Sequence, residues 1–119
     1  MREESKLRLQ EAGIDVDEML GRFMGNEGMA MKFLLRFPQD PSFQKLREAL
    51  NRGDGEEAYT AAHTLKGVAG NLSMKLLLEQ AAVVTDCLRE RDLSAARAGM
   101  PLLEERYRRV VSFLNDLDG

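Results

Sequence analysis

Apolar residues recur every three or four positions along most of the chain, which is the spacing of amphipathic helices. β-Branched residues do not alternate with polar ones, as they would in half-buried strands. Asp15 and Asn26 are predicted to cap two short helices, the first of which ends at Gly25. The segment 38–41 is then predicted to break or kink the second helix, and Asp40 is in position to cap the helix that follows the break.

Three further helices are predicted after Gly53, which ends the helix that follows the break. Asp54 caps the next one and has Glu57 three residues later. Its apolar stripe alternates steps of four and three, through Ala58, Ala62, Leu65, Ala69 and Leu72. Another helix covers about 77–88. The last runs from near Asp92 to Leu117, and Pro101 should kink it or move its start later. Short turns between long helices predict an antiparallel up-down bundle.

Composition fits a single domain with one core, since the 119 residues are 44% hydrophobic and 31% charged. Lys and Arg are scattered along the sequence rather than clustered, and the net charge is −3. Both observations argue against a nucleic-acid binder. Apolar runs are too short to span a bilayer and the N-terminus does not resemble a signal peptide, so we expect a cytoplasmic protein. Cys87, the single cysteine, is interpreted as a small buried apolar residue, and the seven methionines as core fillers.

One helix carries residues that stability alone does not explain. At 100° per residue, His63, Lys66, Gly67 and Gly70 share one face beside the apolar stripe. Each glycine in a helix interior costs about 1 kcal/mol relative to alanine, so the bare face indicates that another molecule approaches it closely. His63 is the only histidine, and Gly67 one turn later leaves it unshielded.

This combination suits a phosphoryl carrier. A neutral imidazole has a free nucleophilic nitrogen at physiological pH. A phosphoryl group on that nitrogen would add nearly two negative charges, and the ammonium of Lys66 is within reach to offset them. The glycine face would let a second protein place its own active site over His63.

The run from Ala62 to Leu72 resembles the signature of histidine-containing phosphotransfer (HPt) domains, which is His-x-Leu-Lys-Gly followed by small residues. Similarity extends to segments 13–16, 25–27, 33–37 and 52–54, and so covers roughly residues 12–117. The resemblance implies an all-α, antiparallel up-down four-helix bundle with a short additional N-terminal helix. We expect a single domain over 1–119, in which 1–12 form a loose lead-in.

The resemblance also implies the role of each site residue. His63 would be phosphorylated, Lys66 would stabilise the phosphoryl group, and Gly67 would make room for a receiver domain. Gly70 would be a small position used either for packing or for contact with the receiver. Arg89, on the next helix, would contact the receiver as well.

The implied function is the relay of a phosphoryl group between receiver-domain aspartates in two-component signalling. The expected partners are response-regulator receivers and a hybrid sensor histidine kinase. No nucleotide-binding loop is present, so the chain should not phosphorylate itself from ATP and is not an enzyme on its own. No cofactor is expected on this chain, and Mg²⁺ is expected on the receiver. We expect a monomer; the identity of the partners and the direction of phosphate flow stay open.

Two positions depart from the family pattern. Ser73 stands where the family often has glycine, and we expect it to cap the next helix. Val84-Thr85 stands where many members have Leu-Glu or Leu-Gln, whose polar residue can help to orient the histidine region. Thr85 is shorter, and its role is left open.

Three alternatives remain at this stage. The chain could be a detached kinase segment, phosphorylated by a separate ATP-binding domain. It could be a module that binds and sequesters receivers without carrying phosphate, which would not depend on His63. A small enzyme or metal protein would need a carboxylate or further ligands near His63, and the sequence offers no such cluster.

Overall fold

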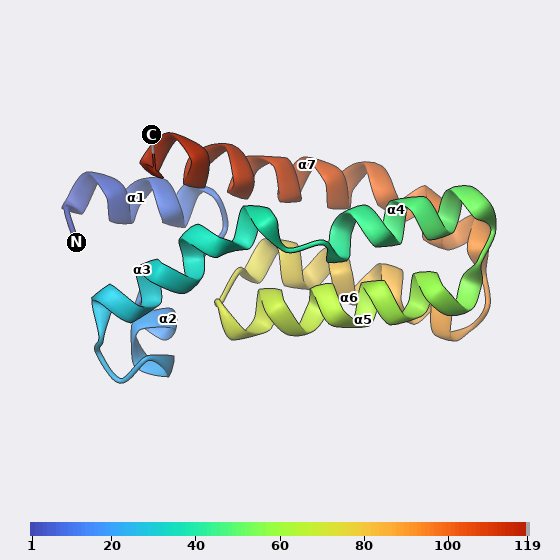
Figure 1. Ribbon diagram of the computed structural model, residues 1–119, viewed down its shortest axis with the longest axis horizontal. Coiled ribbons are helices and arrows are strands. Elements are labelled where there is room, and N and C mark those ends of the chain that lie inside the picture. The colour runs from blue at the N-terminus through green and yellow to red at the C-terminus, as the bar shows by residue number, and fades with distance from the viewer. Residues whose placement is uncertain (119) are drawn as a thin grey trace.

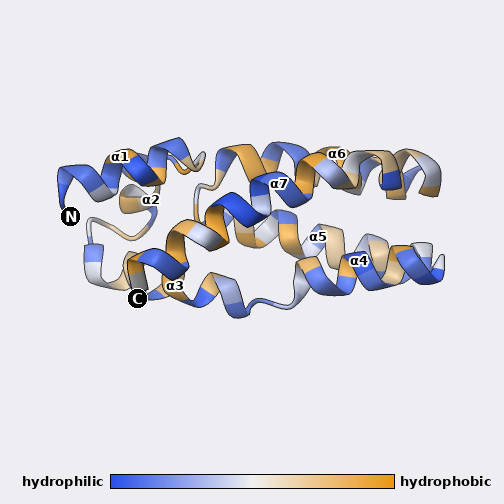
Figure 2. Cartoon of the chain, turned by 90° about the horizontal axis from the view of Figure 1, so that it is seen from above, coloured by the Kyte–Doolittle hydropathy of each residue, from blue (hydrophilic) through white to orange (hydrophobic). Residues whose placement is uncertain are grey.

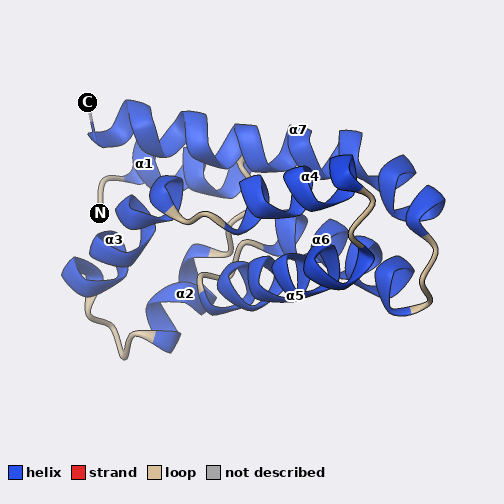
Figure 3. Cartoon of the chain, turned by 45° about the vertical axis from the view of Figure 1, so that its right-hand side comes forward, coloured by secondary structure: helices blue, strands red, loops and turns tan. Residues whose placement is uncertain are grey.

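The computed structural model describes residues 1–118; Gly119, the last residue of the expected domain, lies outside them. The described chain is built from helices and carries no β-strand (Figure 3), so the predicted all-α fold is confirmed. The elements in order are α1 Glu3–Glu11, α2 Val16–Arg22, α3 Glu27–Arg36, the 3₁₀ turn η1 Phe37–Gln39, α4 Ser42–Arg52, α5 Gly55–Asn71, α6 Lys75–Arg89 and α7 Leu93–Asp118.

Helices α4 to α7 form the predicted antiparallel four-helix bundle (Figure 1). Helix α5 packs against both α4 and α6, and α6 packs against α7. Helix α3 and η1 extend beyond α4 and lie against the C-terminal part of α7. Apolar positions face the interior between the helices (Figure 2). The largest fully buried side chains include Leu34, Phe37, Leu46, Leu65, Leu77, Leu103 and Leu114.

The predicted helix boundaries rest on local hydrogen bonds that the structure contains. Asp15, Asn26 and Asp54 each accept a hydrogen bond from the backbone N–H three residues later, at 3.0 Å. Gly53 ends α4 in the left-handed conformation at φ +74°. The Asp40 carboxylate accepts the first N–H of α4 at 2.9 Å. These caps explain why α2, α3 and α5 begin, and why α4 ends, where the sequence predicts.

The N-terminal residues differ from the expected loose lead-in. Residues 3–11 form α1, in which Leu9 is fully buried. The guanidinium of Arg8 lies 4.9 Å from the centre of the Phe113 ring of α7. The expectation was wrong because α1 is mostly polar, and its one buried position, Leu9, is buried only through contact with other parts of the chain.

Helix α7 begins at Leu93, well before Pro101, so the expected later start is wrong. Asp92 accepts the N–H of Ala95 at 2.9 Å and caps the helix. The Gln80 amide of α6 donates to the Gly99 carbonyl at 2.9 Å, in the turn before the proline. These two contacts support the helical turns that proline alone would weaken.

Some expected core positions are not buried. Cys87 is half-buried. Among the methionines, Met19 and Met74 are core residues, whereas Met24 is 95% exposed. None of the described helices has the length and apolar character needed to cross a membrane.

The segment before α2 is held against the turn between α5 and α6. Gly13 has φ +90°, and a Cβ there would lie 2.6 Å from the Cβ of Leu76, so only glycine fits. The N–H of Asp15 donates to the carbonyl of Ser73 at 2.9 Å. This backbone contact places the start of α2 beside the end of α5.

Side chains reinforce the same attachment. Lys75 and Glu18 form an ion pair at 2.6 Å, and the Ser73 hydroxyl donates to Glu18 at 3.0 Å. Hydrogen bonding from Lys75, and then from Ser73, lowers the pKa of the Glu18 carboxyl. Ser73 is buried at φ +54°, and the N-cap of α6 is Met74, without a side-chain cap. The expectation that Ser73 caps α6 is therefore wrong, because its hydroxyl is directed at α2 instead.

Replacing Glu18 by glutamine should destabilise the fold in a pH-dependent way. A carboxyl whose pKa is lowered by folding stabilises the native state above its unfolded pKa, and this stabilisation is lost as pH falls through the folded pKa. Thermal unfolding from neutral to acid pH should show a lower Tm for Glu18→Gln at neutral pH and a shrinking difference in acid. Glu105→Gln, at an exposed glutamate of α7, is the control. A pH-independent difference would contradict the ion-pair explanation.

Candidate functional site

The site is built on α5, whose two sides differ in chemistry. The buried side consists of Ala58, Ala61, Ala62, Leu65 and Ala69, which pack between α4 and α6. His63 and Gly67 lie on the opposite side and are exposed, and Lys66 and Gly70 are half-exposed beside them. The structure therefore brings together the residues that the helical projection grouped, and it leaves the imidazole accessible.

The glycines of this face are not required by packing. A Cβ on Gly67 would meet no atom within 4 Å, and one on Gly70 would lie 3.9 Å from Leu78 Cδ1, an ordinary contact. The fold thus gives no reason for Gly67, which supports a role in contact with another molecule. Whether Gly70 serves packing or contact stays a prediction.

Lys66 lies on the ridge of α5 next to His63, on the side that faces α6. Its ammonium makes no ion pair with any carboxylate in the described residues, unlike Lys6 and Lys75. The adjacent hydroxyls point elsewhere, since Thr64 donates to the Thr60 carbonyl at 3.0 Å. Among the side chains described, those of residues 1–117, no group of three or more potential metal-binding residues comes together.

Sequence reasoning missed the closest aromatic neighbour of the histidine. Tyr59 lies one turn before His63 on α5, and the two ring centres are 5.9 Å apart with planes inclined by 17°. The guanidinium of Arg89, on α6, lies 5.9 Å from the Tyr59 ring centre. The i, i+4 spacing of Tyr59 and His63 was a signal that the sequence offered.

Thr85 does not reach the histidine. Its side chain is fully buried, and its hydroxyl donates to the carbonyl of Ala81 on its own helix at 2.7 Å. From α6, it is Arg89 rather than Thr85 that approaches the histidine region, through Tyr59.

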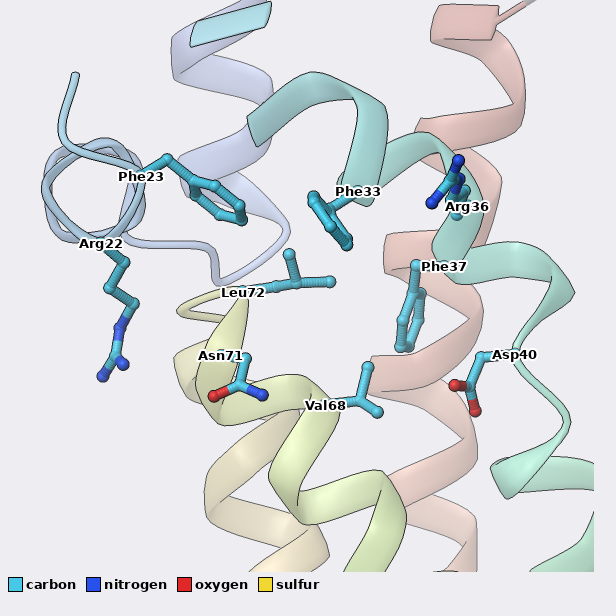
Figure 4. A pocket seen from close by; sticks show the side chains of 9 residues that line it. All are labelled: Arg22, Phe23, Phe33, Arg36, Phe37, Asp40, Val68, Asn71 and Leu72. Carbon is cyan, nitrogen blue, oxygen red and sulfur yellow. The ribbon is translucent and has the colours of Figure 1, made fainter. Parts of the chain in front are cut away.

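A groove of about 590 Å³ opens beside this face, between α2, α3 and the end of α5 (Figure 4). The rings of Phe23 and Phe33 face each other across part of it, with centres 5.5 Å apart. Phe33 of α3 is 43% exposed within this groove. The lining is Arg22, Phe23, Phe33, Arg36, Phe37, Asp40, Val68, Asn71 and Leu72.

The groove and the histidine face are continuous along α5. From His63, Gly67 is about 40° around the helix axis and Asn71 about 80° in the same direction, so these residues lead toward the groove. Tyr59 and Lys66 lie on the other side, toward α6. The imidazole therefore stands between this groove, whose lining is both aromatic and charged, and the side of α5 that carries Tyr59 and Lys66.

These features define a class of protein: a helical bundle that presents one exposed imidazole on a face with little side-chain bulk. A family model described as Hpt domain matches residues 33–113, more than half of the chain. The chain belongs to the Hpt domain family, whose members serve as histidine phosphotransfer modules in phosphorelays. Comparisons with curated proteins and with solved structures found no match.

Replacing Gly67 by alanine should raise the free energy of unfolding by about 0.5–1 kcal/mol, because alanine favours the helix and the site is open. Gly99→Ala in α7 is the matched control. Its Cβ would lie 3.1 Å from Val84 Cγ2 and 3.2 Å from Gln80 Nε2, so it should gain less or lose stability. Chemical denaturation measures both. A loss of stability for Gly67→Ala would show that the fold does need this glycine.

Proposed function

We propose that this protein relays a phosphoryl group between the aspartates of receiver domains by carrying it on His63. The observation on which this rests is the exposed imidazole on α5 beside a glycine that packing does not require. Membership of the Hpt family supports the same chemistry. Lys66, Gly67, Gly70 and Arg89 would assist at the docked interface.

In the forward step, the unprotonated ring nitrogen of His63 attacks the phosphorus of a receiver's phosphoaspartate. The N–P bond forms as the P–O bond breaks, and the electron pair leaves with the aspartate carboxylate. The reverse step passes the group to the aspartate of another receiver. Such transfer depends mainly on positioning and on charge stabilisation.

The contributions of the two proteins are divided. This chain supplies the nucleophile, the ammonium of Lys66 and an open face, and the receiver is expected to bring Mg²⁺ and most of the charge stabilisation. Lys66 is suited to its part because it lies one ridge from His63 and is not paired with a carboxylate in the described structure. The expected upstream partner is a hybrid sensor histidine kinase.

Replacement of His63 by glutamine should abolish labelling. A phosphorylated receiver is mixed with the wild-type protein and, in parallel, with His63→Gln, and the transferred label is tested for loss in acid and persistence in base. Only the wild type should carry an acid-labile label, because the chain has no second histidine.

Other outcomes would redirect the function. Binding of several receivers without label on the wild type would contradict the relay and favour a sequestering module. Label on the wild type only after addition of a separate ATP-binding kinase domain would favour the detached kinase segment.

We also propose that the receiver covers the groove beside His63. The groove is continuous with the histidine face, and its apolar lining includes the 43% exposed Phe33. A protein that seats its active site over His63 would extend over the adjacent rim, and burial of an exposed aromatic ring would favour the complex.

Phe33→Ala should therefore weaken receiver binding by about fivefold, the equivalent of about 1 kcal/mol. Calorimetry with a receiver domain measures the affinity. Leu102→Ala is the matched control, since Leu102 is 40% exposed on α7, outside the groove. Equal affinities for the two variants would exclude the groove from the interface.

A further inference from the structure

Tyr59 lies against the residue that the proposed function makes the phosphoryl carrier. The two rings are nearly parallel, with planes inclined by 17° and centres 5.9 Å apart. Tyr59 is half-buried, whereas His63 is exposed. The exposed imidazole therefore has a more buried ring beside it.

Tyr59 is in turn held from another helix. Arg89 of α6 places its guanidinium carbon 5.9 Å from the Tyr59 ring centre. Asp86, one turn earlier on α6, forms an ion pair with Arg89 at 2.6 Å. A side-chain hydrogen bond with Tyr59, and then one with Asp86, raises the pKa of the Arg89 guanidinium. A chain of contacts thus runs from α6 to the imidazole.

A simple i, i+4 aromatic pair would stabilise α5 locally and have no further role. The contact with Arg89 sets this pair apart, because it connects Tyr59 to α6 as well as to its own helix. The hydroxyls closest in sequence on α5 cannot serve the same purpose, since Thr60 and Thr64 donate to backbone carbonyls.

We propose that Tyr59 is a positioning residue for phosphoryl transfer: its ring, held by Arg89, restricts the imidazole of His63 to orientations in which a ring nitrogen faces an incoming receiver. This inference rests on the proposed relay. An exposed side chain otherwise samples several staggered rotamers, and only some of them suit in-line attack. The assignment gives Arg89 a role within the chain in addition to the expected contact with the receiver.

The test compares Tyr59→Ala with Tyr59→Phe, which keeps the ring and removes the hydroxyl. Because His63 is the only histidine, its imidazole protons are identified in NMR spectra without ambiguity. They should lose the ring-current shift in Tyr59→Ala and keep it in Tyr59→Phe. The rate of transfer from a saturating phosphorylated receiver should fall about three- to tenfold in Tyr59→Ala. It should stay near the wild-type rate in Tyr59→Phe, with receiver affinity unchanged in both.

Each result has a distinct meaning. If the wild type takes no label, the relay itself fails. If the wild type is labelled and Tyr59→Ala is equally fast, or if the phenylalanine variant is as slow as the alanine variant, the positioning role of the ring is wrong. A fall in receiver affinity without a change in the saturated rate would make Tyr59 a docking residue and would also overturn the proposal.

Discussion

The close packing of α5 against its neighbours is the constraint on which the rest of the structure depends. Its buried side is almost entirely alanine, with Leu65 as the one large side chain. Small side chains let helix backbones approach closely, so α5 fits between α4 and α6 with little freedom to rotate. Because the buried side is fixed, the opposite side is fixed too, and His63 is held outward without any contact of its own to the core.

This arrangement separates stability from chemistry along one helix. The alanines of α5 carry the packing, and the exposed side is therefore open to residues chosen for another purpose. Gly67 illustrates the separation, since an added Cβ would meet no atom, whereas Gly99 lies tightly against Val84 in the core. Glycine therefore occurs in this molecule for two different physical reasons. At Gly99 close packing leaves little room for a side chain, whereas at Gly67 packing makes no such demand, and only the structure distinguishes the two cases.

The features that the sequence predicts well are those that depend on neighbours within one helical turn. The cap at Asp54 is one such feature, and the grouping of His63 with Lys66 on one face is another. Features that depend on distant segments were not predictable in the same way. Leu9 is buried because α1 packs against α7, which lies far along the chain. The hydroxyl of Ser73 turns toward Glu18, a residue more than fifty positions away, rather than toward its own helix.

The support of the histidine shows the same distinction between local and distant contacts. The resemblance to the family drew attention to Thr85, but a short side chain buried in α6 satisfies its hydroxyl with the carbonyl one turn earlier. Arg89 lies one turn further along α6, is long enough to cross to α5, and contacts Tyr59 instead. The short Thr85 therefore does not leave the histidine helix without a contact from α6, because Arg89 and Tyr59 make that contact instead. In this chain the contact from α6 toward the imidazole is aromatic and cationic, and it passes through a residue of the histidine helix itself.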